Sequence, residues 1–564
     1  MRTHVILRRS GFGTLASLGI LGVTAALAGC DEPYPDDPAI DPDAPVVQLT
    51  APERGAYLGD VSSVAVRGRI EDDSPLRAVT INGVAAQLGV DGAFALDLPI
   101  SPTGTSLLTV EAVDVDGNVG RETRAISAGP RVPLSTRMDD AVTAALSDRA
   151  LAAIGRATGA LVAQADLGAW VAPYNPVVSE GAPDGPDCLF GSAAVGAMDI
   201  ASAQIELTPV LGGLELTAEL GGVVVPMHLE YAAFCLRGQR DATMSASKVH
   251  LTGRFALGIK EGTFDLKLEN PQVSFEGFQL DLGGVPGRVV GLLNLEAALG
   301  RLLASAVERL AAPKLGAALA GLDGAATTEV LGETLDLAVT PLELTASPVD
   351  ARARLETSFR FRGDEAGPGF VYVPGARPSM DASAGLELAV SAGAINQLLA
   401  SFWSAGGLER AFELTTGDYG GLGKLYDRVE VQALLPPSVR ADDGRVEVMI
   451  PELLISFRDG ARLATQIALN GALELRVERG VDGALRLSTG APRVHVDILR
   501  EGVDGANPLD RAQFEALSSF ALARASNAAA GLLGAIPLPA AAHVRAVEVS
   551  GRGGYIVVDG ALDE

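Results

Sequence analysis

The sequence predicts an α+β protein in which long antiparallel strands alternate with long helices, after a small β-sandwich near the N-terminus. Three patterns support this prediction: extended apolar/polar alternation, apolar stripes at helical spacing between the alternating stretches, and short strands with turn residues in 46–129. The chain has 564 residues, which is too many for one hydrophobic core, so several domains are expected.

The composition narrows the classes of function. Apolar residues make up 48% of the chain and charged residues 20%, so there is enough apolar material to build cores. Aromatic residues are scarce at 5%, which favours aliphatic surfaces over aromatic-lined pockets. The net charge of −26 argues against nucleic acid as a partner, because phosphate binding needs a basic surface. It also argues against simple electrostatic docking on anionic lipid.

The first 29 residues have the composition of an export signal. Arg2, Arg8 and Arg9 precede an apolar stretch that is short for a membrane span and ends in "LAGC" at Cys30. This pattern resembles a bacterial lipoprotein signal. The resemblance implies cleavage before Cys30, acylation of Cys30 by chains such as palmitate, and a mature protein held to the membrane by this N-terminal lipid anchor. An uncleaved anchor helix in residues 1–29 is the alternative.

Residues 30–45 are rich in Asp, Glu and Pro and predict an extended acidic tether. Asp31 follows Cys30 directly, and this placement resembles a signal that retains lipoproteins in the inner membrane of some bacteria. Because that rule varies between bacterial groups, the choice of membrane stays open. The predicted location is the bacterial cell envelope, at the outer membrane or the periplasmic face of the inner membrane.

Short alternating stretches with turns at Asn82-Gly83 and Asp91-Gly92 predict a β-sandwich over residues 46–129. These stretches resemble the small immunoglobulin-like modules of bacterial proteins. Asp114, Asp116 and Asn118 could in principle hold calcium, but the glycine comes too early for an EF-hand loop, so a hairpin turn is the favoured interpretation.

The rest of the chain begins with a predicted helix and long strands. A ladder at mostly four-residue steps predicts the helix through Val142, Leu146, Ala150, Ile154 and Val162. Alternation in 203–234 and 248–282 predicts a curved antiparallel sheet with turns at Gly212-Gly213 and Gly221-Gly222, and a leucine stripe in 292–322 predicts a second long helix.

The same scheme then recurs. A helix around 391–408, several alternating stretches and a helix over 510–534 form a pseudo-repeat of about 200 residues. The predicted domains are therefore a first unit at 135–325 and a second at 326–564.

Three segments resemble the family of bactericidal/permeability-increasing protein, lipopolysaccharide-binding protein and the plasma lipid-transfer proteins, the tubular lipid-binding superfamily. Residues 390–408 are similar to the opening of that family's second barrel, 331–348 to its crossing strand, and 536–562 to its closing strands. The resemblance implies a boomerang of two helix-wrapped antiparallel barrels joined by a central sheet, with paired closing strands at Val547, Val549, Ile556 and Val558.

In that family each barrel has an apolar pocket for phospholipid acyl chains, and the resemblance implies the same here. The candidate lining of the first pocket is Val142, Leu146, Ile154, Val162, Leu214 and Leu216. The candidate lining of the second is Ile395, Leu398, Leu399, Phe402, Phe514 and Leu517. For each residue the alternative is that it only fills the core.

The remaining cysteines and the lysines bear on the same resemblance. With Cys30 acylated, Cys188 and Cys235 are an even pair, as expected of an exported protein. The family commonly has one disulfide in its first barrel, which implies a Cys188–Cys235 bridge. Lysines are few and scattered in this unit, so the lipopolysaccharide neutralisation of the family's antibacterial members is not expected.

No pattern predicts an enzyme. The five histidines lack metal-ligand spacing, and the sequence has no H-E-x-x-H, G-x-S-x-G, Walker or dinucleotide motif, so neither a metal nor another cofactor is expected. The sequence favours an envelope lipoprotein that binds or transfers phospholipid or another acyl lipid. The alternative is a surface scaffold or adhesin whose barrels are structural and whose immunoglobulin-like module binds an envelope protein partner.

Overall fold

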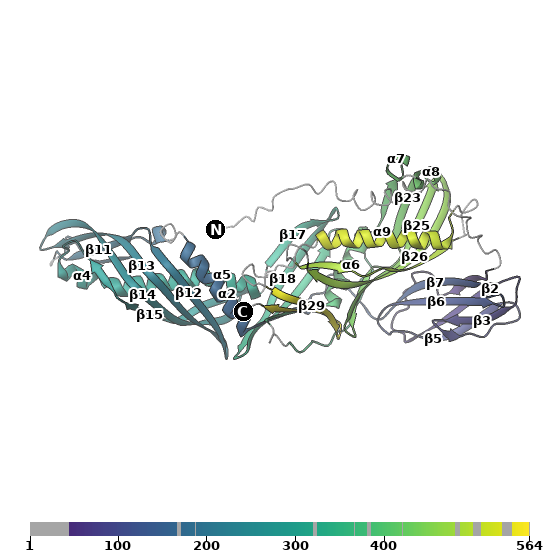
Figure 1. Cartoon of the computed structure of the whole chain (residues 1–564), viewed down its shortest axis with the longest axis horizontal. Coiled ribbons are helices and arrows are strands. Elements are labelled where there is room, and N and C mark those ends of the chain that lie inside the picture. Colours follow the sequence, from purple (N-terminus) through teal and green to yellow (C-terminus); the bar gives the residue numbers. More distant parts are fainter. Residues whose placement is uncertain are drawn as a thin grey trace.

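The computed structural model describes residues 44–165, 171–185, 188–319, 324–365, 367–380, 385–419, 421–479, 485–499, 509–532 and 544–562. The molecule is elongated, with the unit containing β10 to β16 at one end and the sandwich at the other (Figure 1). The predicted signal peptide, Cys30 and nearly all of the tether lie outside the described residues.

The sandwich consists of two antiparallel sheets. One contains β1 (Val46–Ala51), β2 (Ser63–Glu71) and β5 (Ala93–Pro99); the other contains β3 (Leu76–Ile81), β4 (Val84–Ala85), β6 (Gly104–Asp114) and β7 (Val119–Ala128). Alternate residues of β2 are buried, as expected of a strand with one face on a core. The Asp114 carboxylate accepts hydrogen bonds from the backbone of Gly117 and Asn118, so it is part of the β6–β7 turn.

The first unit is a sheet with helices packed on it. Its strands are β10 (Val178–Gly181), β11 (Phe190–Val195), β12 (Asp199–Val210), β13 (Gly213–Ala233), β14 (Leu236–Lys260), β15 (Thr263–Glu276) and β16 (Gln279–Asp281). Its helices are α2 (Asp148–Gln164), α4 (Gly287–Leu293) and α5 (Leu295–Leu319). The strand order is β10-β11-β13-β14-β15, with β12 beside β13 and β16 beside β14.

A seven-stranded central sheet combines distant parts of the chain. Its order is β17 (Gly324–Val330), β18 (Glu333–Ser347), β19 (Asp350–Phe361), β9 (Met138–Ser147), β21 (Gly385–Ser391), β30 (Tyr555–Leu562) and β29 (Val544–Arg552). The predicted crossing strand corresponds to β18. The predicted closing pair is confirmed: Val549 pairs with Val558, and Val547 and Ile556 pair with glycines of the facing strand.

The second unit has a further sheet of β22 (Arg410–Glu413), β23 (Arg428–Ala433), β24 (Ser438–Asp442), β25 (Arg445–Asp459), β26 (Arg462–Arg479), β27 (Leu485–Thr489) and β28 (Arg493–Leu499). Its helices are α6 (Ala392–Ser404), α7 (Thr416–Tyr419), α8 (Leu422–Leu425) and α9 (Arg511–Leu532). Two short strands, β8 (Arg131–Val132) and β20 (Phe370–Val371), pair with each other.

The predicted fold class, α+β with two helix-wrapped barrels, is wrong. More than half of the described residues lie in strands, and these form several antiparallel sheets. In the first unit, the described strand order begins at β10 and finishes at β15 without pairing between these two, so the sheet is open. The alternation of apolar and polar residues indicates a strand and its buried face, but it does not indicate whether the first and last strands pair to close a barrel.

Two local predictions are also corrected. Val142 and Leu146 lie in strand β9, and helix α2 begins only at Asp148. Positions four apart share a face in a strand as well as in a helix, so the ladder could not distinguish the two. Gly221-Gly222 is not a turn between strands, because β13 continues through it with Gly222 at φ +62°. A side chain at Gly222 would come within 2.8 Å of the Ala201 Cβ.

The sandwich docks on the second unit through buried charges. The Arg54 guanidinium lies 2.8 Å from Asp497, 3.0 Å from Glu122 and 3.2 Å from Glu452. Glu452 also accepts a hydrogen bond of 2.7 Å from the Ala125 backbone nitrogen. Burial raises the pKa of Glu452, and the nearby Arg54 charge opposes this effect. The sandwich is thus attached to the second unit by a network that water hardly reaches.

Candidate functional site

The interior of the first unit is an apolar layer between the open sheet and helices α2 and α5. Ser147 begins α2, because its Oγ accepts a hydrogen bond from the Ala150 nitrogen. Two glycines let α2 approach strand β12 closely: a Cβ at Gly155 would lie 2.5 Å from the Ile205 oxygen, and one at Gly159 would lie 2.6 Å from the Ala203 oxygen. The sequence thus places this helix directly against the backbone of the sheet.

Five of the six residues predicted for the first pocket meet in this layer. They are Leu146, Ile154, Val162, Leu214 and Leu216, and all are buried in one apolar cluster. Val142 lies in a different cluster, with Val339 and Leu355 of the central sheet. The five residues are packed core, so they form the wall of the layer and not an open surface.

One partly accessible stretch of the layer lies along β15, a strand from which no candidate lining residue was predicted. Five apolar side chains of this strand pack against the core but stay half-buried, whereas Leu251 and Phe255 on neighbouring β14 are fully buried. We call these five residues the β15 strip: Phe264, Leu266, Leu268, Val273 and Phe275. Their alternation with polar residues in 263–276 was the available sequence signal.

The strip is partly open because β15 is paired with β14 along one edge and, among the described residues, has helix α5 and no second paired strand beside it. The Leu268 nitrogen donates a hydrogen bond of 3.1 Å to Oε1 of Glu308 on α5, so a carboxylate satisfies this backbone group. Gly300 of α5 faces the strand, since a Cβ there would lie 3.4 Å from Val273. A helix covers a strand edge less completely than a paired strand does, which leaves the apolar side chains half-exposed.

By length and composition, Gly287–Arg309 could cross a membrane. In the structure this stretch contributes Val289, Leu299 and Leu303 to the buried core of the first unit. Burial in the core accounts for its apolar character.

Charged groups lie on the outer face of the same strands and are paired with one another. Lys248 contacts Glu219 at 2.7 Å, and His250 contacts Glu276 at 3.2 Å. The hydrogen bond that Lys248 donates to Glu219 raises the pKa of Lys248. In the part of the chain that the structure describes, no group of three or more potential metal ligands is found. The chemistry offered by the strip is therefore apolar contact.

The six residues predicted for the second pocket are not brought together. Ile395 and Leu399 of α6 pack beside Val439 and its neighbours, and Leu398 and Phe402 pack beside Phe361. Phe514 of α9 lies in a third cluster, 5.6 Å from the Phe457 ring, and Leu517 is half-buried on the same helix. The six residues lie in separate clusters because α6 packs on the central sheet and on β24, whereas α9 packs on β27 and β28.

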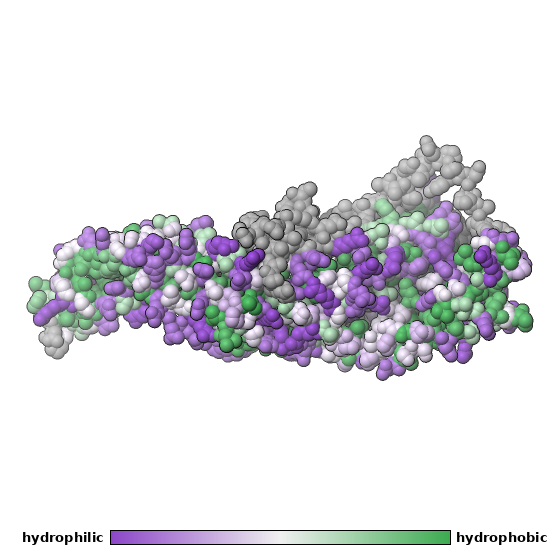
Figure 2. Space-filling view, turned by 60° about the horizontal axis from the view of Figure 1, so that its bottom comes forward, coloured by the Kyte–Doolittle hydropathy of each residue, from purple (hydrophilic) through white to green (hydrophobic). Residues whose placement is uncertain are grey.

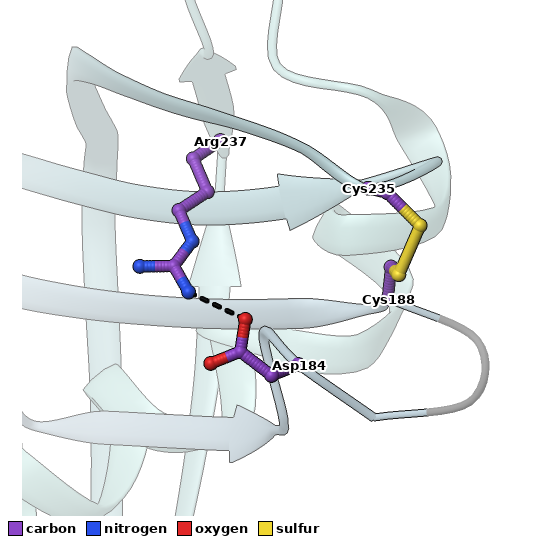
Figure 3. Close-up of a disulfide and its surroundings, with 4 residues drawn as sticks. All are labelled: Asp184, Cys188, Cys235 and Arg237. Carbon is purple, nitrogen blue, oxygen red and sulfur yellow. Dashed lines mark hydrogen bonds and ion pairs between the residues drawn. A yellow bond between two sulfur atoms is a disulfide. The ribbon is translucent and has the colours of Figure 1, made fainter.

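The disulfide implied by the resemblance is present. Cys188 and Cys235 are bonded at the end of the first unit, and beside them Arg237 contacts Asp184 at 2.6 Å (Figure 3). The bond joins the segment before β11 to the turn between β13 and β14.

Comparison with known proteins gives one family match and several distant structures. The family model described as glucodextranase, domain B matches residues 45–129, which contain the sandwich. No curated protein matches the chain.

The similar solved structures include a lipopolysaccharide binding protein, with a TM-score of 0.37 and 12% identity over 75% of this chain and 99% of that one. They also include P47 of Clostridium botulinum E1, with a TM-score of 0.23 and 8% identity over 76% and 100% of the two chains. Fibronectin(III)-like modules of Clostridium thermocellum CbhA match with a TM-score of 0.14 and 11% identity over 40% and 91%. Because these TM-scores are below 0.5, the likenesses assign neither a fold nor a function to the chain.

Proposed function

We propose that this protein is a lipid-anchored bacterial lipoprotein that binds lipid acyl chains along the β15 strip, for lipid binding or transfer at the cell envelope. The observation that carries the proposal is the half-exposure of five apolar side chains directly above a large aliphatic core. An acyl chain on the strip would exclude water from these side chains. Each buried methylene contributes about 0.8 kcal/mol, so a strip of this kind can retain a lipid without a catalytic group.

The arrangement of polar groups supports an apolar ligand in this position. Glu308 already satisfies the backbone of Leu268, so the ligand has no need to supply a hydrogen bond there. Lys248 and His250 of neighbouring strand β14 contact the carboxylates of Glu219 and Glu276 on the opposite face. Binding is then reversible partitioning of a hydrocarbon chain between water or membrane and the protein.

The anchor is the second part of the proposal. Cys30 would be the acylated first residue of the mature protein, and the acidic residues that follow would connect it to the sandwich. Several acyl chains on Cys30 would hold the protein stably at the outer membrane or the periplasmic face of the inner membrane.

Native mass spectrometry of gently purified protein tests the acyl-lipid proposal directly. We expect peaks that carry one or more phospholipid or other acyl-lipid masses. Replacing Leu268 with Asn places an amide on the strip and should lower lipid occupancy several-fold, whereas Ser274→Asn changes the exposed outer face of the same strand and should not. Consistently empty protein, with a normal thermal unfolding transition, would contradict the proposal.

A second candidate function is a scaffold or adhesin whose sandwich binds a protein partner. It is favoured by Val84, Leu88 and Val90, which are exposed in and after β4 of the sandwich. A Val90→Asp variant would then lose partner binding while keeping its lipid occupancy. Because the sandwich is docked through buried charges, this point variant is a cleaner test than deletion of 46–129.

A further inference from the structure

The turn between β13 and β14 exposes two large apolar side chains. Phe234 is 75% exposed and Leu236 is 74% exposed. Ala233 pairs with Leu236, so Phe234 and Cys235 form the two-residue turn, with φ of 52° and 62°. Glycine and asparagine are the usual residues in such left-handed turns, and a bulky side chain there is uncommon. The sequence thus places an aromatic ring at a position where neither burial nor backbone preference favours it.

The turn is fixed in place from two sides. Cys235 is bonded to Cys188, and the adjacent Arg237 contacts Asp184 at 2.6 Å (Figure 3). The Tyr231 side chain lies against Gly238 of the facing strand, where a Cβ would come within 2.6 Å of the ring. These contacts hold the turn, so that Phe234 and Leu236 stay at the surface.

The turn lies at the end of the first unit that is opposite to the sandwich. Strand β13 runs from the central sheet, where the Gly212 nitrogen bonds to the Ala346 oxygen, out to the disulfide. Hydrophobic residues gather on this end of the molecule (Figure 2). Arg288 of α4 lies beside the Phe234 ring, 5.8 Å from its centre. We call Phe234, Leu236 and Arg288 the tip.

The chemistry of the tip fits a lipid surface better than a protein surface. Two apolar side chains on a convex turn are far too small for a standard protein interface, which needs about 800 Å² per partner. They suit insertion between lipid head groups, where arginines such as Arg288 would lie at the level of the phosphates. The net charge of −26 would repel strongly anionic membranes, so the favoured surface is zwitterionic.

We propose that the tip docks the first unit on a zwitterionic phospholipid bilayer by inserting Phe234 and Leu236. The inference rests on the proposed acyl-lipid function, because docking would bring the β15 strip to a source or acceptor of lipid. Residue 44 leads into the sandwich, and the tip lies at the end of the molecule opposite to the sandwich (Figure 1).

Co-sedimentation with phosphatidylcholine vesicles tests the docking. The chain from residue 31 is exported behind an ordinary cleavable signal, so that the disulfide can form and no acyl anchor is attached. We expect this protein to bind the vesicles. We expect the Phe234→Ser/Leu236→Ser variant to bind them more weakly, by a factor of about ten or more. Phe234→Leu should retain binding. The matched control is Leu211→Ser, on the equally exposed turn at the other end of β13.

Depth of insertion provides a second measurement. The fluorescence of a Phe234→Trp variant should be quenched by brominated acyl chains, whereas a Leu211→Trp variant should show only the quenching of the native tryptophans. The proposal is overturned if the unacylated protein does not bind vesicles, if the double serine variant binds as well as the wild type, or if Leu211→Ser has the same effect as the double variant.

Native mass spectrometry distinguishes failure of the docking from failure of the acyl-lipid proposal. The double serine variant should keep the disulfide and the bound lipid while losing vesicle binding. Empty protein that still binds vesicles through Phe234 would contradict the acyl-lipid proposal and leave the docking intact.

Discussion

Arg54 and Glu452 form an ion pair of 3.2 Å across the contact between the sandwich and the second unit, although 398 residues separate them in the chain. The Arg54 side chain is 12% exposed and that of Glu452 is fully buried. The same guanidinium contacts Glu122 and Asp497, and Arg124 also contacts Glu122, so three carboxylates share two arginines. The sandwich and the second unit therefore depend on each other for stability.

Replacing Arg54 with Met should destabilise this contact strongly. Removing one partner of a buried charge cluster leaves the carboxylates uncompensated, and the expected loss of unfolding free energy is about 3–5 kcal/mol. Urea unfolding of the variant and the wild type measures this loss of unfolding free energy. Arg69→Ala is the matched control, because Arg69 and its partner Glu71 are more than half exposed, and its effect should stay within about 0.5 kcal/mol. Equal effects of the two variants would contradict the prediction.

Asp140 should make the central sheet sensitive to acid. Partial burial raises the pKa of Asp140, but hydrogen bonds from Arg354 and Arg377 outweigh this effect and lower it below its ordinary value of 3.8. The stabilisation is therefore fully present above that ordinary value and is lost as the pH falls through the lower pKa of the folded state. Thermal unfolding of wild type and Asp140→Asn should differ at neutral pH and converge in acid. A constant difference would refute this.

The Cys188–Cys235 bond should stabilise the first unit. It closes a loop with a sequence separation of 47, for which chain entropy gives an upper value of about 4 kcal/mol. The Cys188→Ser/Cys235→Ser variant should unfold at a lower urea concentration than the wild type. A reducing agent should shift the unfolding curve of the wild type to the same lower urea concentration, and it should not change the curve of the variant. If neither the double substitution nor reduction changes the unfolding curve, the bond contributes nothing to stability.

Cys30 should be the site of lipid attachment. Cells fed a labelled palmitate analogue should incorporate the label into the full-length protein and not into Cys30→Ala. Cys188→Ser serves as a control for thiol labelling elsewhere, and it should retain the label. Equal labelling of the Cys30→Ala variant would exclude acylation at this position.

Sequence patterns located most elements but not how they assemble. Helices α2, α5, α6 and α9 follow from apolar spacing, because each covers a sheet with one face. Strand β9 was mistaken for helix, because residues 141–147 are buried on both faces and so lose the alternation that identifies a strand. At the edge of β15, Glu308 accepts a hydrogen bond from the Leu268 nitrogen, and these residues are 40 positions apart in the sequence. The periodicity of apolar residues cannot indicate such a contact.

The residues predicted for the first pocket lie in the same unit as the β15 strip, but they are packed core. Leu214 and Leu216 lie on β13, which has paired strands on both sides, and they are buried completely, whereas the β15 strip, with similar alternation, lies at the end of the strand order. Exposure is a property of neighbours in space, so it could not be read from the residues themselves. The same holds for the second set, where Phe402 and Phe514 belong to separate clusters.

The order of strands in the central sheet has a consequence for biogenesis. Strand β21 pairs with β9 on one side and with β30 on the other, so its second edge has no partner until residues 555–562 have been synthesised. Pairings over such sequence separations form slowly, and unpaired edges invite association with other chains. A chain that lacks its last strands would therefore keep one edge of β21 unpaired and open to association with other chains.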